Sequence, residues 1–147
     1  PGRAEKPGEV LIQTYHPDHP LFAALQRHDY LTFARYELDA RREAQYPPFA
    51  HLALLRAESP KAGLALAFLH QAQALASDLT AAEVTLLEPV PSPMERRAGR
   101  YRAQCLVQAG QRPALHAFLA NWLERLDREP LGKKVRWSLD VDPLDLY

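Results

Sequence analysis

The chain has 147 residues, enough to bury one ordinary hydrophobic core with a short additional segment. Hydrophobic residues make up 47% and charged residues 24%, which is typical of folded globular proteins and excludes disordered or collagen-like chains. The 18 basic and 18 acidic residues give a formal net charge of 0, so any site for nucleic acid must be a local patch.

Two further features of the composition bear on where the protein works. The single cysteine, Cys105, lies in an apolar run and cannot form an internal disulfide, which predicts a core side chain in a reducing cytoplasm. The sequence contains no stretch of roughly 18 to 20 apolar residues and no signal-peptide core, so we expect neither membrane insertion nor secretion. The chain opens on Pro1 without a methionine, which indicates a piece of something longer.

The first third of the chain predicts one strand and two helices. Residues 8–14, GEVLIQT, follow a Pro-Gly turn and predict a buried strand that would need partner strands from upstream. After a proline-rich break, helical spacing predicts helices over residues 21–26 and 30–45, the second with Asp29 as N-cap. The segment 46–49, YPPF, ends this helix because proline cannot continue it.

From residue 50 onward, strand and helix patterns alternate. The predicted elements are a strand over 50–57, a helix over 60–76 with Ser59 as N-cap, strands over 84–87 and 101–108, a helix over 113–126, and a strand over 134–141. This β-α-β-β-α-β order predicts an α+β, ferredoxin-like domain, in which two helices cover one face of a four-stranded antiparallel sheet.

The segment 91–102, PSPMERRAGRYR, is the strongest candidate for a binding surface. Prolines hold an extended connection up to residue 93, and four arginines then fall within seven residues around Gly99: Arg96, Arg97, Arg100 and Arg102. Arginines beside a glycine that lets backbone approach phosphate, and beside Tyr101 on which a base can stack, indicate a surface for single-stranded nucleic acid. A solvated, arginine-rich hairpin without a ligand is the alternative.

Other polar residues suggest a carboxylate site and argue against a metal site. Arg112 stands at the start of the second predicted helix, with His116 one turn later on the same face, and a guanidinium there can hold a carboxylate. An ordinary surface arginine is the alternative. Asp140 and Asp142 provide too few ligands for a metal, so we expect them to pair with arginines or to accept backbone hydrogen bonds.

The sequence also lacks the common catalytic signatures. It contains no glycine-rich phosphate loop, no zinc-ligand spacing and no nucleophile elbow. We therefore expect no independent catalytic centre and no bound metal in this chain.

Four motifs, in order, resemble the PriA family of replication-restart helicases. Residues 2–14, GRAEKPGEVLIQT, resemble part of the last helicase motif and the strand after it, and residues 134–143, KVRWSLDVDP, resemble the family's C-terminal end. Between them, YPPF at 46–49 and PMERRAGRYR at 93–102 also match. The resemblance spans essentially the whole chain and identifies it with the C-terminal region of such a helicase.

This resemblance implies an organisation and a set of partners. Residues 1–15 would end the second helicase lobe, 16–49 would form a helical linker, and 50–147 would form the C-terminal ferredoxin-like domain. That domain would contact single-stranded and forked DNA, other primosome proteins and the acidic tail of single-stranded DNA-binding protein (SSB). Arg112 falls where the family places the arginine that grips the tail's terminal carboxylate, and His116 falls where some members carry glutamine.

The family implied is a 3′ to 5′ DNA helicase that restarts stalled forks and assembles the primosome, with ATP, magnesium and zinc bound by the parent protein. Arg3 would match the last motif's final arginine, which reaches toward nucleotide phosphates. Walker-type motifs and zinc-binding cysteines are absent from this sequence, so we expect no cofactor and no ATP hydrolysis or unwinding by this chain alone. The alternatives are a structural brace for the helicase lobes without DNA contact, or a small autonomous enzyme.

Overall fold

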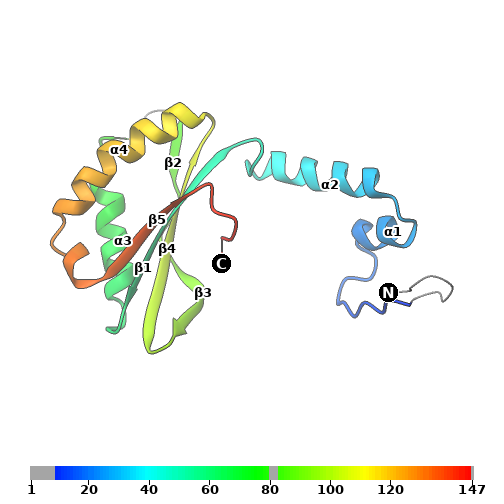
Figure 1. Cartoon of the computed structure of the whole chain (residues 1–147), viewed down its shortest axis with the longest axis horizontal. Coiled ribbons are helices and arrows are strands. Elements are labelled where there is room, and N and C mark those ends of the chain that lie inside the picture. The colour runs from blue at the N-terminus through cyan, green and yellow to red at the C-terminus, as the bar shows by residue number, and fades with distance from the viewer. Residues whose placement is uncertain (1–8, 80–82, 147) are drawn as a thin grey trace, which may run out of the picture. The chain divides into compact units, whose positions relative to one another are not determined.

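A computed structural model describes residues 9–79 and 83–146 of the chain (Figure 1). The chain divides into two compact units, residues 1–40 and 41–147, and the boundary lies within helix α2 (Tyr30–Glu43). The predicted division after residues 15 and 49 remains a prediction. Within the described ranges, no helix combines the length and the apolar character needed to cross a membrane.

Both helices of the first unit begin at a side-chain cap. Helix α1 (Pro20–Gln26) starts where the Leu21 N–H donates to His19 Nδ1 at 3.2 Å, and Pro20 occupies the first turn. Helix α2 starts where the Thr32 N–H donates to Asp29 Oδ1 at 3.1 Å, which confirms the predicted cap. Hydrogen bonds from Thr32 to the Asp29 carboxylate also lower the pKa of Asp29.

The strand predicted over residues 8–14 does not form in residues 9–14, and residue 8 lies outside the described residues. These residues are in coil, with Val10 exposed by 63% and Leu11 by 88%. A strand gains stability only from partner strands, and the described residues offer none here. The prediction was wrong for the structure of this chain by itself.

Helix α2 ends at Glu43, before the predicted end at residue 45, because the chain closes the helix with its own hydrogen bonds. The Gln45 N–H donates to the Arg42 carbonyl at 3.2 Å, and the Tyr46 N–H donates to the Arg41 carbonyl at 2.8 Å. With Gln45 at a φ of 51°, this bond pair is a Schellman cap. The helix therefore ends before it reaches the prolines of the YPPF segment, which were predicted to end it.

The second unit contains a five-stranded sheet and two further helices. Its elements are β1 (His51–Ser59), α3 (Leu64–Leu75), β2 (Val84–Leu86), β3 (Val90–Arg97), β4 (Arg100–Ala109), α4 (Arg112–Arg128), a 3₁₀ turn (Gly132–Lys134) and β5 (Arg136–Val141). All strand pairs are antiparallel and the order is β2-β4-β1-β5, with β3 also paired to β4. This order confirms the predicted ferredoxin-like α+β fold.

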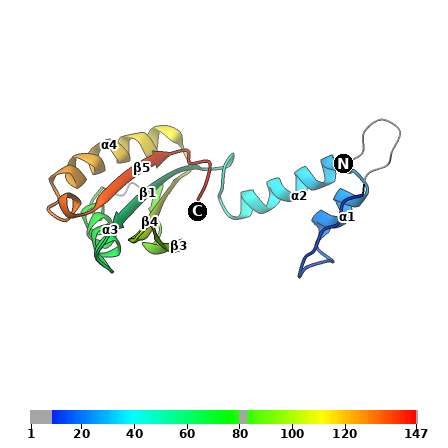
Figure 2. The same ribbon diagram turned by 60° about the horizontal axis from the view of Figure 1, so that its bottom comes forward.

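The fifth strand, β3, was predicted only as an extended connection. It pairs with one end of β4 (Figure 2) while β2 pairs with the other end, so the two strands follow each other along the same edge. The register shifts between Pro91 and Arg96, where the segment is irregular. Prolines are tolerated in an edge strand because its outer N–H positions need no sheet partner.

The predicted N-cap at Ser59 was wrong. Strand β1 runs further than predicted and ends at Ser59, which lies opposite Tyr101 of β4. The Ser59 hydroxyl accepts a hydrogen bond from the Lys61 N–H at 3.1 Å, which turns the chain after the strand. Helix α3 then begins at Leu64, with Gly63 as its N-cap at a φ of 75°.

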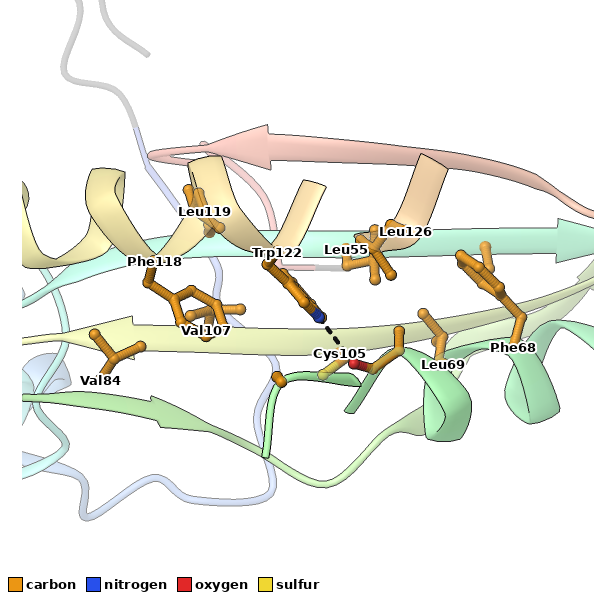
Figure 3. Close-up of a cluster of buried hydrophobic side chains, with 14 of the residues drawn as sticks. Leu55, Phe68, Leu69, Val84, Cys105, Val107, Phe118, Leu119, Trp122 and Leu126 are labelled. Carbon is orange, nitrogen blue, oxygen red and sulfur yellow. Dashed lines mark hydrogen bonds between the residues drawn. The ribbon is translucent and has the colours of Figure 1, made fainter. Parts of the chain in front are cut away.

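The core lies between the sheet and the two helices. Alternate residues of β1 and β4 point toward α3 and α4, and the largest side chains between the layers come from the helices (Figure 3). The cluster includes Leu55, Phe68, Leu69, Cys105, Val107, Leu115, Phe118, Leu119, Trp122 and Leu126. Cys105 is a core side chain, as predicted, and burial raises the pKa of its thiol to about 11.

Helix α4 supplies hydrogen bonds that close the C-terminal end of α3. The last four carbonyls of a helix lack partners within it. Trp122 Nε1 donates to the Ala72 carbonyl at 2.8 Å (Figure 3), and Arg125 Nη1 donates to the Leu75 carbonyl at 2.8 Å. Arg125 also pairs with Asp78, and this bond lowers the pKa of the Asp78 carboxyl.

We expect Trp122→Phe to lower the free energy of unfolding by about 2 to 4 kcal/mol, because it leaves a cavity and an unpaired buried carbonyl. Chemical denaturation of the 147-residue chain measures the change. The control Asn121→Ala, at an exposed site on the same helix, should change the unfolding free energy by less than about 0.5 kcal/mol. An equally small loss for Trp122→Phe would contradict this role.

Candidate nucleic-acid interface

The predicted arginine segment forms a tight hairpin between β3 and β4. Arg97 and Arg100 lie opposite each other, with Ala98 and Gly99 as the two-residue turn. Both turn residues have positive φ, 49° and 76°, the backbone combination whose twist matches paired strands. The arginines are therefore presented by a defined hairpin end.

The hairpin sorts the five predicted DNA-binding residues onto two faces. Residues directly opposite in an antiparallel pair point to the same side, so Arg97 and Arg100 share one face, and Arg102 joins them by strand alternation. Arg96 and Tyr101 are opposite each other on the other face, where the Arg96 guanidinium lies 5.5 Å from the ring centroid. Arg97, Arg100 and Arg102 thus face away from the helices.

Two arginines outside the predicted binding segment lie on the same face. Across β4, β1 and β5, Arg102, Glu58 and Arg136 form one row, while Gln104, Arg56 and Ser138 form the next. We define the arginine face as Arg56, Arg97, Arg100, Arg102 and Arg136. The alternating pattern of the last strand already places Arg136 on the polar side of that strand. Which residues lie beside Arg136 follows only from the order of the strands in the sheet.

Acidic side chains on this face hold some of the arginines. Glu58 Oε1 lies 3.8 Å from Arg100 Nε and 3.7 Å from Arg136 Nη1, and Arg56 Nη1 lies 3.2 Å from Asp140 Oδ2. Arg97 and Arg102 make no ion pair with any residue in the described ranges. The five arginines of this face therefore outnumber the two carboxylates, those of Glu58 and Asp140, that pair with them.

The other end of the same sheet face is covered by the chain's C-terminal segment. The Asp145 carbonyl accepts from Arg56 Nη2 at 2.6 Å, and the Leu146 carbonyl accepts from Gln104 Nε2 at 2.9 Å. Leu52 and Leu54 point to this face and are only 2% and 1% exposed. The arginine end remains open, with the Arg136 side chain exposed by 80%.

The predicted carboxylate site lies at the start of α4. Arg112 is the first residue of the helix, and its Nη2 atom lies 3.0 Å from Asp142 Oδ2, with both side chains about half exposed. His116 is exposed one turn later. The pairing of Asp140 with Arg56 and of Asp142 with Arg112 confirms that these aspartates bind arginines.

The two aspartates do not share a face, although their spacing in a strand would place them so. Strand β5 ends at Val141, and Asp142 has a φ of 52° that turns the chain. The Asp142 N–H donates to the Leu52 carbonyl at 2.9 Å, which fixes this turn against β1.

No group of three or more metal-ligating side chains occurs among residues 9–79 and 83–146. Arg3, the predicted contact to nucleotide phosphates, lies outside the described residues. The site that the described part of the chain offers is therefore a set of guanidinium groups, suited to phosphates and carboxylates.

Comparison with known protein families gives one decisive match. The family model described as "Primosomal protein N C-terminal domain" matches residues 42–144, which include the whole sheet and both of its helices. The chain belongs to this family. The resemblance to PriA that the four sequence motifs indicated is thereby confirmed.

Relatives from distant bacteria match nearly the whole chain. The Replication restart protein PriA of Bacillus subtilis is 37% identical over 97% of the chain and 18% of its own length. The protein of the same name from Haemophilus influenzae is 37% identical over 99% of the chain and 20% of its own length. The chain thus spans about a fifth of the length of the curated relatives it matches.

Proposed function

We propose that the chain acts as the C-terminal DNA- and protein-binding domain of a PriA-type 3′ to 5′ helicase that restarts stalled replication forks in the cytoplasm. The single observation that supports this most is the arginine face on a domain of the primosomal protein N family. In this proposal the domain contacts single-stranded and forked DNA but is not itself an enzyme. ATP, magnesium and zinc would be bound by other parts of such a protein.

The hairpin supports the DNA-binding proposal through charge and shape. Arg97 and Arg100 lie at its tip with exposed side chains, and guanidinium groups bind phosphates with paired donors. On the other face, the Arg96 guanidinium lies over the Tyr101 ring, 5.5 Å from its centroid, and this pair of flat groups can stack with a base. Phosphate contacts of this kind bind nucleic acid without reading its sequence.

Replacing Arg96, Arg97 and Arg100 together with alanine should weaken single-strand binding by the 147-residue chain. Because each neutralised phosphate of a single strand contributes about 0.7 to the slope of log K against log salt, the slope should fall by about 2. Fluorescence anisotropy with a labelled oligonucleotide measures both quantities. The triple lysine variant, which keeps the charges, should retain the slope, and an unchanged slope in the alanine variant would remove the hairpin from the DNA site.

The second part of the proposal is that Arg112 and His116 bind the acidic C-terminal tail of SSB. Arg112 already holds one carboxylate, that of Asp142, at an exposed helix start. A peptide's terminal carboxylate could take the place of Asp142 there, with His116 as a further hydrogen-bond donor. Exposed ion pairs are weak, so such an exchange costs little.

Asp142→Asn should strengthen binding of an acidic tail peptide by a factor of about two to five, because it removes a competing exposed ion pair. Asparagine tolerates the positive φ at this position, so the turn is retained. Arg112→Ala should abolish binding in a calorimetric titration. Equal binding by Arg112→Ala and the parent chain would exclude the site.

The alternative function is a structural brace for the helicase lobes. It is favoured by the internal ion pairs of Arg56, Arg100 and Arg136, which occupy three of the five guanidinium groups on the arginine face. Undetectable DNA binding by the 147-residue chain, with normal binding by an intact PriA-type protein, would support the brace. ATPase or nuclease activity of the purified chain would instead revive the small autonomous enzyme.

A further inference from the structure

A hollow crosses the open face of the sheet beside the hairpin. It has a volume of about 300 Å³ and is lined by residues of β1, β3, β4 and β5, including Arg56, Glu58, Ser92, Arg102, Arg136 and Ser138. We propose that this hollow binds a backbone phosphate of a nucleic-acid strand that continues from the hairpin onto the sheet. This inference rests on the proposed DNA-binding function and extends it to residues outside the hairpin.

The register of the sheet places two arginines on either side of the hollow. Arg102 of β4 and Arg136 of β5 lie opposite the same β1 residue, Glu58. Neighbouring strands are about 4.8 Å apart, so the two arginine backbones are separated by roughly 10 Å. Two long side chains at this separation can both reach a single phosphate between them.

The side chains of the hollow have donors available for such a phosphate. The Arg102 side chain makes no ion pair with the residues that the structure describes. Among the residues that the structure describes, Arg136 pairs with the Glu58 carboxylate at 3.7 Å, a distance too long for a strong hydrogen bond. A phosphate would therefore gain guanidinium donors from both sides, and Ser138, whose hydroxyl can donate a hydrogen bond, lines the same hollow.

Glu58 occupies the position that the phosphate charge would take. Its single carboxylate is shared by Arg100 and Arg136, and its side chain is 29% exposed. In the free protein it reduces repulsion among the arginines, and toward an approaching phosphate it is repulsive. It follows that removing the charge of Glu58 should strengthen binding of a strand.

The hollow is also continuous with the hairpin tip. Arg97, Arg100 and Arg102 are consecutive side chains on one face of the β3–β4 hairpin, and Arg102 lines the hollow. Beyond Arg56, the C-terminal segment covers the sheet through the Asp145 and Leu146 carbonyls. A strand following the arginine face thus runs from the hairpin to Arg136 and leaves at the β5 edge.

The test compares Arg136→Gln with Arg128→Gln in the 147-residue chain. Both arginines are highly exposed, at 80% and 82%, and each has one weak pair to a glutamate, but Arg128 lies on helix α4. With a labelled oligothymidine probe, Arg136→Gln should lower the slope of log K against log salt by about 0.7. The ratio of the parent's affinity to that of the variant should therefore fall about fivefold for a tenfold rise in salt. Arg128→Gln should bind like the parent, and equal slopes for all three chains would overturn the proposal.

Glu58→Gln provides an independent variant, because it should bind the same probe more tightly than the parent. Unchanged or weaker binding by a folded Glu58→Gln chain would also overturn the proposal. Calorimetry with inorganic phosphate tests whether the hollow binds free phosphate rather than the backbone phosphate of a strand. We expect no difference between parent and Arg136→Gln there, whereas a loss of phosphate binding without a loss of strand binding would assign a free-phosphate site instead.

The outcome for the hollow can be told apart from the outcome for the hairpin. If the hairpin alanine variant loses salt-dependent binding but Arg136→Gln does not, the proposed DNA-binding function stands and the hollow is excluded. If neither variant changes the slope, the DNA-binding function itself fails.

Discussion

Strand β1 pairs antiparallel with β4 on one side and with β5 on the other, and this double pairing fixes what each face of the sheet presents. On the helix side, Ala53, Leu55 and Ala57 are buried in the core. On the other side, the next residues of the same strand, Arg56 and Glu58, lie between polar residues of both neighbours. One alternating sequence therefore builds the core and the arginine face together, and a shift of one residue would exchange them.

Charge balance within the domain follows from this arrangement. Glu58, Asp140 and Asp142 each lie close to an arginine that could otherwise bind an external anion. Such exposed pairs contribute little to stability, so their carboxylates can be displaced by a phosphate or a peptide carboxylate. The net charge of 0 for the whole chain thus coexists with a local excess of positive charge.

Sequence patterns predicted most of the second unit because its strands and helices are strongly periodic. The alternation from Val135 to Leu139 and the apolar face of α4 both correspond to what the structure buries. Strand β3 was missed because its prolines are usually excluded from strands, and only its place at the sheet edge permits them. The strand at residues 8–14 was predicted from an apolar pattern whose partners are not in the described chain.

The sequence alone predicted the hairpin part of the candidate site but not the part on β1 and β5. The hairpin arginines are neighbours in sequence, so the order of the amino acids alone reveals that they cluster. Arg56 and Arg136 are 80 residues apart and meet only through the pairing of β1 with β5, where Arg136 lies opposite Glu58. Local patterns indicate which face a side chain occupies, but not which strand lies beside it.

The measurement that tests the central claim most directly is an NMR titration of the 147-residue chain with a short single-stranded oligonucleotide, observed through backbone amide and arginine side-chain signals. We expect shifts confined to the β3–β4 hairpin, residues 56–58 of β1 and the first residues of β5. Shifts concentrated on α3 and α4, with the signals of the arginine face unchanged, would contradict a binding role for that face.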